Sequence, residues 1–163
     1  MKTNLWGRTI LSVYKYLERL TDAIDQLIER QALNSFYYNS GRGSENNCLS
    51  VVSRIIEMSE RKKVLINLKV LTDNALKGCN PLLANILIDR YMDEDECDII
   101  AIRHNLSKRT FFRRLAQAEE QFCNGLARQG FDEENLKQYL AKEKWIFDTY
   151  SKFENDDAEN EVV

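Results

Sequence analysis

A run of cationic side chains between residues 103 and 114 is the part of the chain best equipped to bind another molecule. Five of these residues are Lys or Arg and none is acidic, whereas residues 89–98 carry six acids and one arginine. Solvated helix faces usually mix both signs, because opposite charges one turn apart stabilise a helix. Like charges one turn apart, such as Arg109 and Arg113, repel each other instead. Phosphate groups would offset that repulsion, so the pattern indicates a nucleic-acid partner; an ordinary basic helix face is the alternative interpretation.

The spacing of apolar residues places these cations on the second helix of a helix-turn-helix. We predict a first helix from about residue 95 to 103 that buries Ile100 and Ala101. Asn105 then supplies a residue that tolerates the left-handed conformation of a tight turn, and the Ser107 hydroxyl caps the next helix. The apolar residues of that helix recur at steps of four, three and four and share one buried face: Phe111, Leu115, Ala118 and Phe122.

The opposite face of this helix would read DNA. In helix-turn-helix proteins the second helix enters the major groove, and Arg is well shaped for a bidentate bond to guanine. We therefore expect Lys108, Arg109 and Arg113 to face the bases. Phe112 would either touch a thymine methyl group or pack against a neighbouring helix.

Other polar groups near the same helix would hold the DNA backbone. We expect Arg114 and Gln117 to bind phosphates, together with the amides of Ser107 and Lys108 at the helix N-terminus. The candidate DNA-binding residues are Ser107, Lys108, Arg109, Thr110, Phe112, Arg113, Arg114 and Gln117.

The net charge of −3 conceals a basic body with an acidic end. The last ten residues contain five acids, so residues 1–153 carry a net charge of +2. Such an acidic, nearly apolar-free segment cannot offset its ordering entropy, so residues 154–163 are predicted to be disordered. This tail would either keep the protein in solution or compete with DNA for the basic helix.

Residues suited to catalysis or metal binding are scattered along the chain. The four cysteines form no C-x-x-C pair and His104 is the only histidine, so we expect no metal site and no cofactor. No set of nucleophile, base and orienting group can be assembled, so an enzyme is the least favoured class. Four unpaired thiols favour a reducing cytoplasm. No apolar run is long enough to span a membrane.

Low proline and glycine content and a helical period throughout predict an all-α fold. An N-terminal pair of long helices would occupy residues 1–78, with a loop at 34–47 and a kink or break near residues 61–63. The first helix would pack against the second or, in a homodimer, against a partner chain; the intramolecular hairpin is preferred. Its seam comprises Ile10, Val13, Leu17, Leu20, Ile24 and Leu27. The seam of the second helix comprises Leu49, Val52, Ile56, Leu65, Leu68, Leu71 and Ala75.

Three further segments complete the predicted organisation. Residues 79–130 form the helix-turn-helix DNA-binding domain, residues 131–153 form one C-terminal helix capped by Asp132, and residues 154–163 form the acidic tail. The dense aromatic residues of the C-terminal helix would either close the core or form a patch for a partner subunit.

The segment from Asn80 to Phe122 resembles the C-terminal half of the ArpU and RinA-like phage transcriptional regulators. The DNA-binding part of that family is similar to region four of bacterial sigma factors. The match is densest at Ser107, Arg109, Thr110, Phe111, Arg113, Arg114 and Leu115. The resemblance implies a regulator, typically an activator of late phage or prophage genes, that binds promoter DNA and has RNA polymerase as a further potential partner. His104 departs from the pattern, because such motifs usually bury leucine there, and we expect its imidazole to reach the surface.

The leading hypothesis is thus a sequence-specific transcriptional regulator that binds double-stranded DNA through the helix starting at Ser107. A small terminase-type DNA-packaging subunit would use similar helices and form a ring. A helical interaction protein that binds no nucleic acid is the alternative from a different class.

Overall fold

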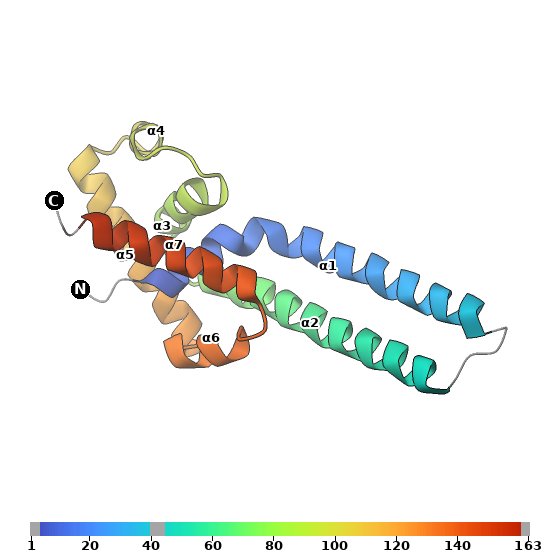
Figure 1. Cartoon of the computed structure of the whole chain (residues 1–163). Helices are drawn as coiled ribbons and strands as arrows, with labels where there is room; N and C mark the ends of the chain where they lie inside the picture. The colour runs from blue at the N-terminus through green and yellow to red at the C-terminus, as the bar shows by residue number, and fades with distance from the viewer. Residues whose placement is uncertain (1–3, 40–44, 161–163) are drawn as a thin grey trace. The chain divides into compact units, whose positions relative to one another are not determined.

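The computed structural model describes residues 4–39 and 45–160, and all regular structure within them is helical. No strand occurs in these ranges, so the predicted all-α class is confirmed. Figure 1 shows the elements in chain order: α1 (Leu5–Asn39), α2 (Glu45–Lys77), α3 (Pro81–Leu87), the π-helical turn η1 (Ile88–Met92), α4 (Cys97–Arg103), α5 (Lys108–Arg128), α6 (Glu133–Tyr139) and α7 (Lys144–Asn160).

The chain divides into two compact units whose limits differ from the predicted boundary at residue 78. One unit combines Met1–Lys15 with Lys69–Val163, and the other is Tyr16–Leu68. The start of α1 and the end of α2 therefore belong to the unit that contains α4 and α5. Within that unit the Tyr14 hydroxyl donates a 2.6 Å hydrogen bond to Asp73, which joins the two helices. Both helices continue from one unit into the other with no linker segment between them. The amino-acid composition therefore did not indicate where one unit ends and the other begins.

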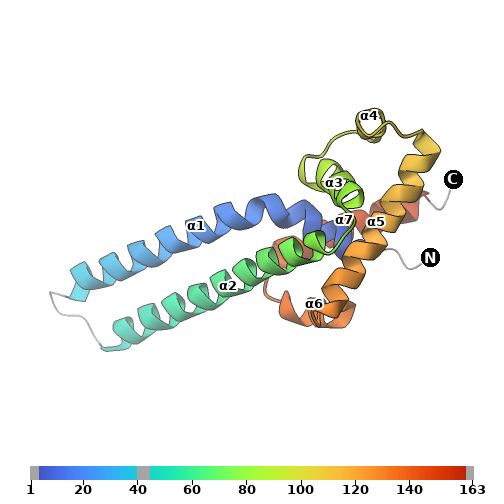
Figure 2. The same cartoon turned by 180° about the vertical axis from the view of Figure 1, so that it is seen from behind.

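In the unit Tyr16–Leu68, α1 and α2 run side by side as an antiparallel hairpin, which both views show (Figures 1 and 2). Leu17 and Ile24 of α1 are buried, and so are Leu65 and Leu68 of α2. The predicted seam residue Leu27 is 48% exposed, and the half-buried Ile28 takes the next seam position instead. The preferred intramolecular hairpin is thus confirmed, with its seam shifted at the distal end.

The apolar stripe predicted for the first half of α2 is wrong. Leu49, Val52 and Ile56 are each more than half exposed, whereas the half-buried residues are Val51, Ile55 and Met58. Both faces of this segment carry aliphatic residues at steps of three and four, so periodicity alone selected the wrong one.

The predicted break near residues 61–63 is also wrong, because α2 is one continuous helix. The half-buried seam continues from Met58 through Lys62 to Leu65. Lys62 occupies a seam position because its ammonium group lies 2.6 Å from an Asp25 carboxylate oxygen of α1. Its aliphatic stem packs along the seam while its charge is paired, a use of lysine that an apolar pattern does not record.

The C-terminal region contains two helices where one was predicted over residues 131–153. Asp132 caps α6 as expected, accepting a 2.9 Å hydrogen bond from the Asn135 amide. The chain then turns after Leu140, where Glu143 is buried and accepts a 2.7 Å hydrogen bond from the Trp145 indole. The aromatic residues of α7 pack inward: Phe147 and Tyr150 both contact the ring of Trp6. They therefore close the core, which was one of the two predicted alternatives.

The predicted disordered tail begins too early. Helix α7 continues to Asn160, and residues 161–163 lie outside the described residues. Asp157 explains the extension, because its two carboxylate oxygens accept hydrogen bonds of 3.0 and 3.1 Å from the Arg8 guanidinium. The composition of this segment indicated that it could not offset its ordering entropy, whereas one of its acids is neutralised by a cation from the start of α1.

The corrected seam of α2 makes a direct prediction for two adjacent isoleucines. Ile55→Ala should lower the free energy of unfolding by about 1–2 kcal/mol, because it removes half-buried methyl groups from the α1 contact. Ile56→Ala should change it by less than about 0.5 kcal/mol, because Ile56 is 57% exposed. Urea unfolding followed by far-UV circular dichroism measures both. Equal losses for the two variants would contradict the seam.

Candidate nucleic-acid interface

Helices α4 and α5 and the turn between them form the predicted helix-turn-helix. Asn105 adopts the left-handed conformation with φ of 53°. The Leu106 amide then donates a 2.8 Å hydrogen bond to the Ala101 carbonyl and closes the turn. Ser107 is the N-cap of α5, its hydroxyl oxygen accepting from the Thr110 amide at 3.3 Å. These local features are as predicted, although α4 begins at Cys97, two residues later than expected.

The buried face of α5 is also as predicted. Phe111, Ala118 and Phe122 are fully buried and Leu115 is 9% exposed. This stripe packs α5 against α3 and α4, as Figure 2 also shows for α3 and α5. The side chains on the rest of the helix surface therefore have a fixed direction.

A polar network near the middle of α5 adds a second anchor. Glu119 is buried at 4% exposure, accepts a 2.5 Å hydrogen bond from the Tyr91 hydroxyl and lies 3.2 Å from Nε of Arg8. Burial, and then the Glu119 carboxylate, raise the pKa of Tyr91 far above its usual value, so the phenol remains a donor. Burial alone would lower the pKa of Arg8, but Glu119, Tyr91 and Asp157 together raise it. The network thus links α5 to η1, α1 and α7.

The predicted site residues lie together on the exposed surface of α5. Lys108, Arg109, Phe112, Arg113 and Gln117 are exposed, while Thr110 and Arg114 are half-buried. The exposed Phe112 is in edge contact with Phe111 and has 47% of its surface accessible. Of its two predicted roles, packing against a neighbouring helix is therefore the less favoured.

The cations near α5 differ in whether a carboxylate already neutralises them. Arg103 lies 3.1 Å from Asp89 and 2.7 Å from Asp95, and its hydrogen bonds to Asp95 and Asp89 raise its pKa. Lys108 lies 3.1 Å from Asp98 of α4. Arg103 is thus occupied by two acids and Lys108 by one.

Three arginines near the beginning of α5 have no such partner. No carboxylate within the described ranges lies at ion-pair distance from Arg109, Arg113 or Arg114. Arg114 instead donates a 3.1 Å hydrogen bond to the Gln117 side chain. The uncompensated positive charge is therefore concentrated on one segment of α5, and Arg109 and Arg113 lie one turn apart on it.

The expected surface position of His104 is wrong. Its side chain is only 13% exposed, and Nε2 lies 2.8 Å from an Asp89 carboxylate oxygen. The carboxylate supplies the hydrogen-bond partner that a buried imidazole requires. Asp89 thus contacts both His104 and Arg103, which ties the end of α4 to η1.

The sequence argument missed the acids that pair with the basic segment. Asp89, Asp95 and Asp98 were counted only as part of an acidic stretch that precedes the cations, with no pairing between the two. A helix-turn-helix folds back on itself, so the beginning of the first helix lies beside the beginning of the second. The ten-residue spacing of Asp98 and Lys108 was the available signal.

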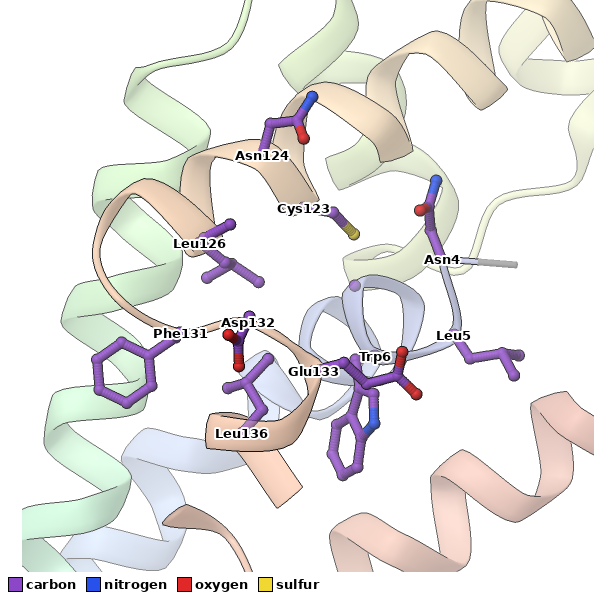
Figure 3. A pocket seen from close by; sticks show the side chains of 12 residues that line it. Asn4, Leu5, Trp6, Cys123, Asn124, Leu126, Phe131, Asp132, Glu133 and Leu136 are labelled. Carbon is purple, nitrogen blue, oxygen red and sulfur yellow. The ribbon is translucent and has the colours of Figure 1, made fainter. Parts of the chain in front are cut away.

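A cavity of about 210 Å³ lies at the other end of α5 (Figure 3). It is lined by residues from the beginning of α1, the end of α5 and the beginning of α6, including Trp6, Cys123 and Leu136. Cys123 is fifteen residues after Lys108, which corresponds to roughly 22 Å along a helix. The sulfur of Cys123 faces Gly7 so closely that a Cβ at Gly7 would lie 2.6 Å from it. The cavity is thus separate from the basic segment.

Other kinds of site receive no support within the described residues. No group of three or more His, Cys, Asp or Glu side chains there is arranged to hold a metal ion. No helix in this part of the chain has the length and apolar character needed to cross a bilayer.

Comparison with known proteins returns no family model, no curated protein and no solved structure that matches this chain.

The two adjacent phenylalanines of α5 test the division between its buried and exposed faces. Phe111→Ala should lower the free energy of unfolding by roughly 3–5 kcal/mol, because it leaves a cavity in the core. Phe112→Ala should change it by less than about 1 kcal/mol, because nearly half of that side chain is already in solvent. Thermal or urea unfolding measures the change in the free energy of unfolding for both variants. A larger loss for Phe112→Ala would mean that α5 is rotated.

The thiol beside Gly7 should be slow to react. Burial, and then the Glu119 carboxylate, raise the pKa of Cys123 to about 11 from a reference value of 9.0. Only the thiolate is alkylated, so iodoacetamide at neutral pH should modify native Cys123 on the order of 100-fold more slowly than the unfolded chain. Mass spectrometry of the peptide that carries Cys123 gives both rates. Equal rates in the native protein and in urea would contradict the burial.

Proposed function

We propose that this protein is a sequence-specific, DNA-binding transcriptional regulator that places the beginning of α5 in the major groove of double-stranded DNA. The observation that carries the proposal is the pair Arg109 and Arg113. Both side chains are exposed, lie one turn apart and have no carboxylate partner within the described residues. Two uncompensated guanidinium groups on a rigid helix suit the phosphates and guanine edges of a duplex.

The support for this function comes from three properties of the same segment. Burial of Phe111, Leu115 and Phe122 fixes the direction of the helix. The N-cap at Ser107 leaves the first amides of α5 directed away from the helix, where they suit a phosphate. The resemblance to the ArpU and RinA-like regulators points to the same surface and favours promoter DNA of phage or prophage genes as the target.

Within this proposal, the candidate residues divide into two roles. Arg109 and Arg113 contact base edges, and Phe112 contacts a thymine methyl group. Lys108, which was expected to face the bases, is assigned to a phosphate instead, because Asp98 already pairs with it. Arg114 and Gln117, already hydrogen-bonded to each other, hold a phosphate. The proposal places the protein in the cytoplasm and keeps RNA polymerase and a second copy of the chain as potential partners; a homodimer would read half-sites about one helical turn apart.

Selection of bound sequences from a random DNA pool tests the function directly. Repeated rounds should enrich one sequence, and that duplex should bind more tightly than the starting pool. Binding that is equal for all sequences would contradict a sequence-specific regulator, and a ring-shaped oligomer in light scattering would favour a DNA-packaging subunit instead. No binding to any duplex at low salt would favour the helical interaction protein, because electrostatic association is strongest there.

Two arginines of α5 provide a matched pair for the base contact. Arg113→Ala should cost roughly 1–3 kcal/mol of affinity for the selected duplex and relax the preference at one base position. Arg128→Ala removes the same charge from the exposed last turn of the same helix and should have a much smaller effect. Fluorescence anisotropy with the labelled duplex measures both affinities. Wild-type affinity in the Arg113→Ala variant would exclude the base contact.

A further inference from the structure

The beginning of α4 carries a carboxylate directly beside the proposed DNA-binding surface. Asp98 lies in the first turn of α4, and its Oδ1 atom is 3.1 Å from Nζ of Lys108, the first residue of α5. Both side chains are about two-thirds exposed, at 67% and 68%. Among the four cations of this surface, Lys108 is the one that a carboxylate of the described chain neutralises.

We infer that Asp98 is an intramolecular competitor for DNA phosphate at Lys108 and thereby limits sequence-independent binding to DNA. This inference rests on the proposed function. A phosphate that approaches Lys108 must replace the carboxylate, so the contact adds less affinity than a free lysine would. The contact between Lys108 and a phosphate also gives a smaller net release of counterions, because Asp98 already neutralises Lys108 before DNA binds.

The competition weakens contacts to phosphate more than contacts to base edges. Non-specific binding depends almost entirely on cation–phosphate contacts, so occupying one cation removes a sizeable part of it. Arg109 and Arg113 have no carboxylate partner in the described ranges and keep their full capacity for base edges. The pattern of paired and unpaired cations therefore favours sites where the two arginines find bases to contact.

The test measures binding of a fluorescent duplex of random sequence to the full-length protein over a range of salt concentrations. Asp98→Asn should increase affinity at low salt by about two- to five-fold, the range expected for an exposed ion pair. The logarithmic salt dependence should become steeper by up to about one unit, because Lys108 is then free to neutralise a phosphate, whose condensed cation is released. Asp148→Asn is the control for net charge, because Asp148 is exposed on α7 and holds no ion pair within the described residues. It should change neither quantity by a comparable amount.

A double-mutant cycle separates competition at Lys108 from simple repulsion between Asp98 and DNA. In a Lys108→Gln background, Asp98→Asn should gain no more than the Asp148→Asn control does. A gain that persists without Lys108 would overturn the inference, and so would weaker binding by Asp98→Asn, which would show that the carboxylate helps to position the lysine. Circular dichroism verifies that each variant is folded. Failure of the wild-type protein to bind any duplex would instead refute the proposed function, so the two failures are distinguishable.

Discussion

The burial of one face of α5 is the constraint on which the rest of the helix-turn-helix unit depends. Phe111 and Phe122 have no accessible surface, so α5 cannot rotate about its axis without exposing an aromatic ring. Glu119 adds a directional constraint on the same helix, because a buried carboxylate is tolerated only while Tyr91 and Arg8 remain in place. The exposed arginines have a defined direction only because this opposite face is fixed. Binding geometry and core packing are therefore properties of a single helix.

Local sequence signals predicted the helix-turn-helix closely. The left-handed Asn105, the cap at Ser107 and the buried stripe from Phe111 to Phe122 each depend on neighbouring residues alone. Such signals are readable from spacing because the interacting groups lie within one or two turns of each other. The exposed position of Arg109 and Arg113 followed from the same periodicity.

Interactions between distant residues account for what the sequence could not reveal. The pairs of His104 with Asp89 and of Lys62 with Asp25 join side chains that no local pattern relates. In both cases the apolar period predicts an aliphatic residue at the position. A polar residue is tolerated there because a carboxylate from another element pairs with its side chain. The seam of α2 failed for a related reason: Ile55 and Ile56 are equally apolar, and only the position of α1 decides which of them is covered. Helix α7 likewise extends past the predicted end because Arg8, far away in sequence, neutralises Asp157.

The contact between Arg8 and Asp157 has a consequence for the order in which the protein is made. These residues are 149 positions apart, and their unit is assembled from the first and the last parts of the chain. The beginning of α1 must therefore wait until α7 has left the ribosome before it acquires this contact. The segment between Tyr16 and Leu68 contains both arms of its own hairpin and can pair earlier in translation. Until α7 has emerged, Trp6 also lacks the rings of Phe147 and Tyr150, which contact it in the folded protein.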